Sequence, residues 1–253
     1  MSGQAELAIV CARFKESLAW VTPVLDAFPS THLFLFDCGA RPIGGEIVNH
    51  PRVTIHDKQP RTTLYWAYLE YCRQYYDQLP DYVLFCHGHN RSWHQRLPLM
   101  EVLRSLHACM PFDYVNIGDR VYPDWLDERS EFAACTRKLW LQLQAILDAP
   151  SIGPRLVEIN AGQACVSKQA IRGRDRETWR ELAQFASGCT HHSNEDYGFE
   201  GCFHVIMSQP WERPVIVRNL ETLLYRPLLG DLGLFIKQFF HPRVNELILR
   251  GGR

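Results

Sequence analysis

Three histidines follow an apolar stretch in the segment from Asp81 to His94. Besides His94 these are His87 and His89, which are two residues apart and would point to the same side of a strand that ran through both. A neutral imidazole binds Zn or Mn, whereas a protonated one can neutralise a phosphate by hydrogen bonding. The cluster therefore predicts a site for a metal ion or a phosphate. The alternative is a set of ordinary loop histidines that make surface or capping bonds.

A second group of reactive side chains lies near residue 200. Asp196 and Glu200 carry carboxylates, which can act as a general base and remove the proton from an attacking hydroxyl. If a helix begins near residue 198, Glu200 and His204 lie four residues apart on one face, so His204 can orient Glu200 or reach a metal. The alternative for residues 194–196 is a helix N-terminus whose polar side chains satisfy free amides and the helix dipole.

Basic side chains at predicted strand ends and helix starts are candidates for phosphate contacts, namely Arg13, Lys15 and Arg61. Arginine can grip a phosphate through two hydrogen bonds, and the alternative for each residue is a solvated surface charge. Trp93 stands within the histidine cluster and is predicted to line a pocket and stack on a ligand ring. The alternative for any tryptophan is a place in the core.

The elements that must position these residues follow from hydrophobic periodicity and from turn signals. Strands are predicted at residues 7–11, 32–36, 52–55, 82–86, 114–118 and 162–167. Helices are predicted at residues 14–28, 62–78, 97–109, 136–147, 177–185 and 198–207. This alternation predicts an α/β fold with a mixed, mainly parallel sheet flanked by helices. An amphipathic tail at 220–249 is expected to pack back on the same domain.

Composition narrows the class of protein. The 253 residues favour a single domain with one continuous core. Lysine plus arginine (27) nearly balance aspartate plus glutamate (28) without long charge runs, which argues against a nucleic-acid or anionic-membrane surface. Nine cysteines without a Cys-x-x-Cys pair indicate free thiols and a cytoplasmic setting. No apolar stretch approaches the roughly 20 residues that span a bilayer.

Several segments, in their order and spacing, resemble a family of proteins catalogued as domain of unknown function 3431. They cover most of the chain. The segments are residues 9–20, residues 65–85, His87-x-His89 with Trp93-His94, residues 162–167 and Glu200-x-x-x-His204. This resemblance implies common ancestry and leaves the activity open.

The order of elements also resembles that of the GT-A glycosyltransferases, a Rossmann-like fold that binds nucleotide-sugars. This resemblance implies that Asp37, after the second strand, contacts the base or ribose of the nucleotide. In that fold a later strand ends in Asp-x-Asp, which holds a divalent ion against the diphosphate, but His87-Gly-His89 stands there in this chain. The histidines therefore either change the metal from Mn or Mg or replace it.

The two resemblances together predict a glycosyltransferase that moves a sugar from a nucleotide-sugar to a glycan or other hydroxyl acceptor, with inversion. Residues 1–117 would bind the nucleotide, and residues 118–253 would bind the acceptor. The predicted catalytic residues are Glu200, Asp196 and His204. The predicted nucleotide contacts are Arg13, Asp37, Arg61, His87, His89 and Trp93. The predicted metal ligands are His87, His89 and His204.

Two other functions stay open from the sequence. A His-x-His pair at a strand end also begins several hydrolytic metal sites, which would make the protein a metal-dependent hydrolase. The usual Asp-His continuation is missing here, because Arg91 and Ser92 occupy those positions. The absence of Asp-x-Asp also fits a noncatalytic module that binds carbohydrate or nucleotide. Phosphate-loop, dinucleotide-binding and serine-hydrolase motifs are absent from the sequence.

Overall fold

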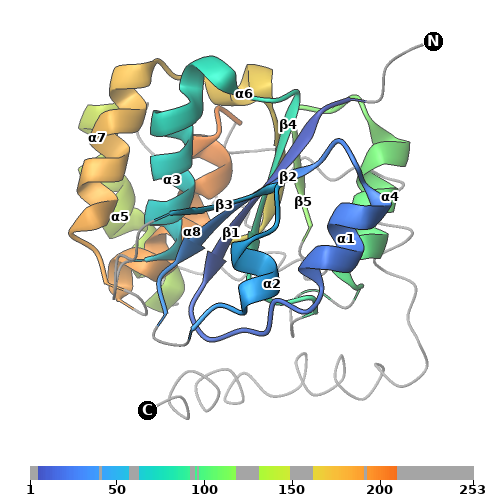
Figure 1. The fold of residues 1–253 in the computed structure, drawn as a ribbon. Coiled ribbons are helices and arrows are strands. Elements are labelled where there is room, and N and C mark those ends of the chain that lie inside the picture. Colours follow the sequence, from blue (N-terminus) through green and yellow to red (C-terminus); the bar gives the residue numbers. More distant parts are fainter. Residues whose placement is uncertain are drawn as a thin grey trace, which may run out of the picture.

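The computed structural model describes residues 5–39, 42–56, 63–91, 95, 97–117, 131–148, 162–190 and 193–209. In this part of the chain, helices cover both faces of a six-stranded sheet (Figure 1). The strands are β1 (Leu7–Arg13), β2 (His32–Asp37), β3 (Val53–His56), β4 (Tyr82–His87), β5 (Tyr114–Asn116) and β6 (Ala164–Ser167). The helices are α1 (Val21–Ala27), α2 (Gly45–Val48), α3 (Leu64–Tyr75) with the 3-10 turn η1 (Tyr76–Gln78), α4 (Leu99–Cys109), α5 (Glu131–Leu147), α6 (Lys168–Arg172), α7 (Arg176–Ser187) and α8 (Asn194–Ile206).

The strand order is β3-β2-β1-β4-β6-β5. Strand β1 is parallel to β2 and β4, and β2 is parallel to β3, whereas β6 is antiparallel to β4 and β5. The mixed, mainly parallel α/β fold predicted from the sequence is therefore confirmed. The chain leaves β1 for β2 and β3, then returns to place β4 on the other side of β1. The order thus reverses between β1 and β4, and open α/β sheets bind ligands at the carboxyl ends of strands beside such a reversal.

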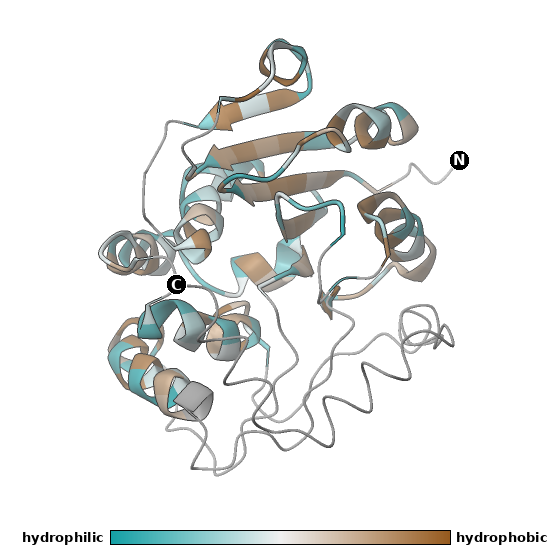
Figure 2. Ribbon diagram, turned by 90° about the horizontal axis from the view of Figure 1, so that it is seen from below, coloured by the Kyte–Doolittle hydropathy of each residue, from teal (hydrophilic) through white to brown (hydrophobic). Residues whose placement is uncertain are grey.

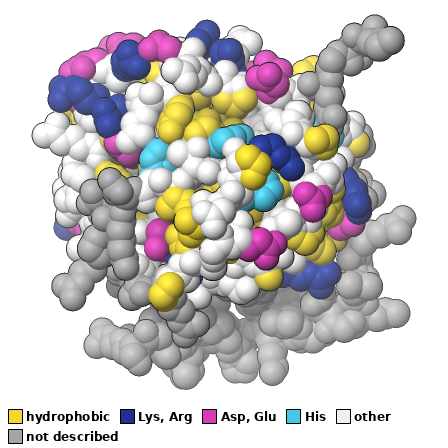
Figure 3. Space-filling model, viewed as in Figure 1, with side chains coloured by type: hydrophobic (Ala, Val, Ile, Leu, Met, Phe, Trp, Pro, Cys, Tyr) yellow, Lys and Arg dark blue, Asp and Glu magenta, His cyan; other side chains and the backbone are white. Residues whose placement is uncertain are grey.

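Apolar side chains from both faces of the sheet form two core layers. In β1, Val10 and Ala12 belong to the layer beneath α3, α5, α7 and α8, whereas Ile9 and Cys11 belong to the layer beneath α1 and α4. Burial on both faces explains why β1 and β4 read as apolar runs without alternation. The strands in Figure 2 are coloured mostly as hydrophobic. On the face viewed in Figure 3, acidic and basic side chains are interspersed. No helix in the described ranges has the length and apolar character needed to cross a bilayer.

Three predicted helix starts are wrong, and one of them is that of the helix predicted at 136–147, which begins at Glu131. The helix predicted at 14–28 covers only Val21–Ala27. The residues after β1 instead form a loop in which the Glu16 carboxylate accepts hydrogen bonds from the amides of Phe14 and Lys15. The helix predicted from residue 198 begins at Asn194, where the Ser193 hydroxyl caps it by accepting the Asp196 amide at 3.2 Å. The predicted tail at 220–249 lies outside the described residues.

Helices α5 and α8 cross closely at two glycines of α8. A Cβ atom on Gly201 would overlap the Thr136 side chain, and one on Gly198 would lie 2.7 Å from Cβ of Leu139. This close approach helps to fix α8, and with it Asp196 and Glu200, against the rest of the fold.

The substitution Gly201→Ala is expected to lower the free energy of unfolding by about 1 to 3 kcal/mol, because overpacking outweighs the better helix propensity of alanine. Urea unfolding followed by circular dichroism measures the change. Gly188→Ala is the matched control, since its Cβ would meet only the Phe185 carbonyl oxygen, at 3.5 Å. Equal stability of the two variants would contradict the close crossing.

Candidate functional site

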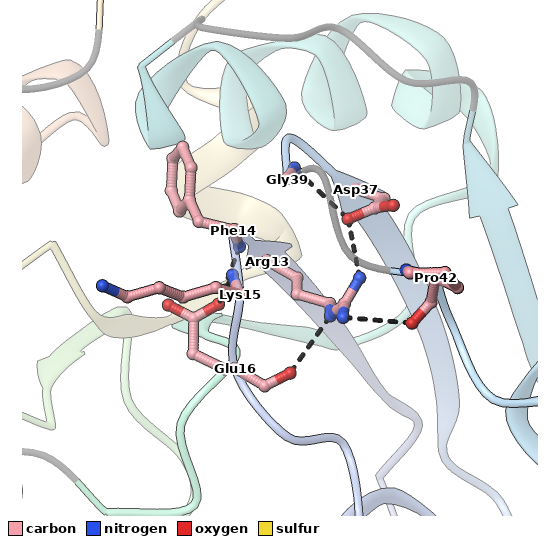
Figure 4. A network of polar contacts seen from close by, with 7 residues as sticks. All are labelled: Arg13, Phe14, Lys15, Glu16, Asp37, Gly39 and Pro42. Atoms are coloured by element: carbon pink, nitrogen blue, oxygen red, sulfur yellow. Dashed lines mark hydrogen bonds and ion pairs between the residues drawn. The ribbon is translucent and has the colours of Figure 1, made fainter.

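An ion pair joins the carboxyl ends of β1 and β2 (Figure 4). Nη1 of Arg13 lies 3.0 Å from Oδ1 of Asp37, and the two side chains are only 5% and 12% exposed. Arg13 also donates to the carbonyl oxygens of Glu16 (3.1 Å) and Pro42 (3.4 Å). The guanidinium is therefore engaged on several sides, and it fixes the carboxylate of Asp37 at the end of its strand.

The Glu16 carboxylate is held by the backbone of its own loop. Its Oε2 accepts hydrogen bonds from the amides of Phe14 (2.7 Å) and Lys15 (2.9 Å), and its Oε1 lies 3.4 Å from Nε2 of His89. Burial acts to raise the pKa of Glu16, but these amide hydrogen bonds, with the charge of His89, outweigh it and lower the pKa below its ordinary value. Glu16 is thus a fixed, ionised carboxylate at the end of β1.

Gly88, after β4, is hydrogen-bonded both to the end of β1 and to the loop that follows β1. Its amide donates to the carbonyl oxygen of Ala12 (3.1 Å), and its own carbonyl accepts the indole N–H of Trp20 (2.8 Å). A Cβ atom on Gly88 would lie 2.9 Å from Cβ of Glu16. Only glycine lets Glu16 lie this close to the chain that carries His87 and His89.

The two histidines of the His-x-His pair face different neighbours. Strand β4 ends at His87 and His89 lies in the following turn, so no strand runs through both residues, which was the condition for both imidazoles to point to one side. The His87 amide donates to Oε1 of Gln163 (3.2 Å), whereas His89 lies beside Glu16. The two ring centroids are 6.3 Å apart, with a 56° angle between the planes.

A metal site was predicted from His87, His89 and His204. Within the ranges that the structure describes, no group of three or more His, Cys, Asp or Glu side chains is arranged to hold a metal ion. The described residues therefore do not offer a three-residue ligand set of the kind that holds zinc. The ligand roles of the three histidines stay a prediction.

Tyr65 connects the end of β4 with α8. A Cβ atom on Gly162, whose φ is +69°, would lie 2.8 Å from the Tyr65 hydroxyl and 3.2 Å from Nε2 of His87. On its other side the Tyr65 ring stacks on Phe199 of α8, with centroids 5.2 Å apart. The tyrosine thus spans the distance between His87 and the helix that carries the candidate bases.

Asp196 is anchored at the N-terminus of α3. It is 5% exposed, and its Oδ1 accepts a short hydrogen bond from the hydroxyl of Thr63. The same Thr63 oxygen accepts the amide of Tyr65 at 3.2 Å and caps α3. The alternative considered from the sequence, in which Asp196 serves only the N-terminus of its own helix, is therefore incomplete. Its side chain also binds Thr63 at the N-terminus of α3.

Glu200 lies one turn after Asp196 on α8 and is partly buried. Burial raises the pKa of its carboxyl to about 8, and the nearby charge of Asp196 adds to this effect. His204 is 8% exposed and lies on the same face of α8, four residues further on, as its spacing predicted. A carboxyl group with a pKa near neutrality is suited to proton transfer.

Four of the predicted residues lie at the carboxyl ends of strands: Arg13 at the end of β1, Asp37 at the end of β2, and His87 and His89 at and just after the end of β4. Asp196, Glu200 and His204 lie on α8. Lys15 is exposed and contributes its backbone amide to Glu16, while Arg61 and Trp93, with His94, lie outside the described residues. Four further side chains belong to the site but were not predicted: Glu16, Thr63, Tyr65 and Gln163. A signal was present only for Glu16, an acidic residue three positions after Arg13. From the sequence, Thr63 would be a helix cap, Tyr65 a core residue and Gln163 a residue at the edge of a strand.

Fold and site together define a layered α/β protein with a polar site at the carboxyl ends of β1, β2 and β4. Residues 9–217 match the family described as "Protein of unknown function (DUF3431)", and the chain therefore belongs to that family. No curated protein is significantly similar to the chain. Among solved structures, the galactosyltransferase LgtC in complex with donor and acceptor sugar analogues is similar at 15% identity and a TM-score of 0.36. The similarity covers 78% of this chain and 70% of that one.

Proposed function

We propose that the protein is a glycosyltransferase that moves a sugar from a nucleotide-sugar to a hydroxyl of a glycan or other acceptor, with inversion. The observation that supports this most is the position of the site. Arg13 and Glu16 follow β1, and His87 and His89 follow β4, so they flank the reversal of strand order between these strands. Open α/β sheets bind nucleotides at this place.

The donor would lie along this edge. Asp37 contacts the base or ribose, and Arg13 holds its carboxylate in position, which gives Arg13 a positioning role instead of the direct phosphate contact that the sequence suggested. His87 and His89 lie where the diphosphate would leave. There they stabilise its developing charge by hydrogen bonding.

The acceptor hydroxyl would be deprotonated from the α8 side of the site. Glu200 is the stronger candidate for the base, because its raised pKa leaves it more basic than an ordinary carboxylate once it is ionised. Asp196 is held by Thr63, and its nearby charge raises the pKa of Glu200. In an inverting displacement the base takes the hydroxyl proton as the oxygen attacks the anomeric carbon and the nucleoside diphosphate leaves.

Because we propose that His87 and His89 themselves stabilise the diphosphate by hydrogen bonding, we expect transfer to survive chelation. Treatment with EDTA, followed by dialysis, should change the rate less than twofold. The rate is measured as release of nucleoside diphosphate, and added Mn serves as the control arm. A loss of activity that Mn restores would show that the histidines act as metal ligands.

Nucleotide binding tests the proposal without requiring the acceptor. We expect at least one nucleoside diphosphate to raise the melting temperature of the protein, and His87→Asn to reduce that rise. His50→Asn is the matched control, because His50 lies in the loop before β3, where its Nδ1 accepts the Arg52 amide. No shift with any nucleotide, with or without Mn, would count against the proposed donor.

A further inference from the structure

A hollow opens on the α1 and α4 side of the histidine pair. Its volume is about 470 Å³, and the loops after β1 and β4 line it. Polar side chains from Glu16, His89 and Asn90 lie together with apolar ones from Trp20, Pro98 and Met100. The predicted roles of Asp37, Asp196 and Glu200 do not involve this hollow.

The two oxygens of the Glu16 carboxylate have different surroundings. Oε2 is occupied by the amides of Phe14 and Lys15. Oε1 faces His89 at 3.4 Å, which is long for a hydrogen bond. A buried carboxylate oxygen that retains acceptor capacity is a strong site for a hydroxyl donor.

The side chains around Oε1 restrict the chemistry of the ligand. A cationic ligand would lie against His89 and Arg91, which also lines the hollow, so a neutral donor is favoured. Vicinal hydroxyls fit best, because one can donate to Oε1 while the next bonds the imidazole of His89. The apolar side chains that line the hollow can pack against the C–H face of the sugar ring that carries these hydroxyls.

We propose that Glu16 and His89 form a binding site for the vicinal diol of a sugar ring at the mouth of this hollow. The inference rests on the proposed function, because it assigns one part of a nucleotide-sugar reaction to this place. The diol can come from the ribose of the donor or from a sugar ring of the acceptor. Both present two adjacent hydroxyls.

The test is a comparison of ligands with and without the diol, measured by titration calorimetry. One arm uses the nucleoside diphosphate that binds best and its 2′-deoxy analogue; the other uses monosaccharides and their 2-deoxy analogues. Removing a hydrogen bond to a charged group should weaken binding by about 10- to 100-fold. In Glu16→Gln, which keeps the size and an acceptor oxygen, this preference should fall to about threefold or less.

Glu181→Gln on α7, where the side chain is 44% exposed, is the matched control and should retain the full preference. Discrimination in the nucleotide arm assigns the site to ribose, and discrimination in the monosaccharide arm assigns it to a sugar of the acceptor. If the wild-type protein binds nucleotides but shows no preference for the diol in either arm, this inference fails alone. This inference also fails alone if the Glu16→Gln variant keeps the preference for the diol. If no nucleotide and no sugar binds, the proposed function fails, and this inference fails with it.

Discussion

Replacing Glu200 by glutamine is expected to lower the rate of sugar transfer by about 10²- to 10⁴-fold, the usual contribution of a general base. The amide keeps the shape of the side chain but cannot accept the proton of the acceptor hydroxyl. The measurement is kcat for release of nucleoside diphosphate in the presence of acceptor. Binding of the nucleotide should change little, because Glu200 lies on α8 and not at the ends of β1 and β4.

The pH dependence of the rate gives a second signature of the same residue. A base must be ionised, so with the pKa of Glu200 at about 8 the wild-type rate should rise as pH increases through 8. Glu200→Gln should lose this rise. Glu195→Gln, five residues earlier on the helix, is the matched control and should keep both the rate and the profile.

The contribution of Glu200 to the free energy of unfolding should fall as pH rises, whereas the rate of transfer should increase. The carboxyl of Glu200 has an ordinary pKa of 4.5 when unfolded and about 8 in the folded protein, so folding favours its neutral form. Its contribution to stability is full below pH 4.5 and is lost as pH rises towards 8. Glu200→Gln should therefore gain stability relative to wild type between these values.

A Glu200→Gln variant with normal kcat and an unchanged pH profile of the rate would exclude Glu200 as the base.

The second large effect is expected at Gly39, which follows β2 and the ion-paired Asp37. A Cβ atom on Gly39 would overlap the carbonyl oxygen of Phe14, a backbone atom that cannot rotate away. The Gly39 amide also lies 3.3 Å from Oδ1 of Asp37. Gly39→Ala should therefore push the two loops apart, lower the free energy of unfolding by about 3 kcal/mol and abolish nucleotide binding.

The control for this substitution is Gly44→Ala, a few residues later in the same loop. A Cβ atom on Gly44 would have no neighbour within 4 Å, and its φ of −62° suits alanine. Urea unfolding and thermal shifts with nucleotide should both be close to wild type in this variant. Wild-type behaviour of Gly39→Ala would show that the β1 and β2 loops are not in contact at this point.

Much of the fold follows from the sequence, because β1 and β4 are apolar runs, turn residues bound the strands, and each long helix has a regular apolar face. The failures lie where a side chain replaces regular hydrogen bonding. The loop after β1 contains apolar residues at helical spacing, but the Glu16 carboxylate binds the amides of Phe14 and Lys15, so the helix starts only at Val21.

The site was harder to predict than the fold, since its contacts join residues far apart in the chain. The spacing of Glu200 and His204 was sufficient to place them on one helical face. Nothing local indicates that Thr63 donates to Asp196, 133 positions away, or that Tyr65 lies between Gly162 and Phe199. These contacts depend on the packing of α3 against α8, which periodicity alone does not specify.

The most direct test of the account is release of nucleoside diphosphate from a panel of nucleotide-sugars, measured for the wild-type protein and for the double variant Asp196→Asn with Glu200→Gln. We predict release from at least one donor by the wild-type protein, and its loss in the double variant, which should still bind the nucleotide. Release that is undiminished in the double variant would contradict the mechanism. No release from any donor would contradict the proposed function itself.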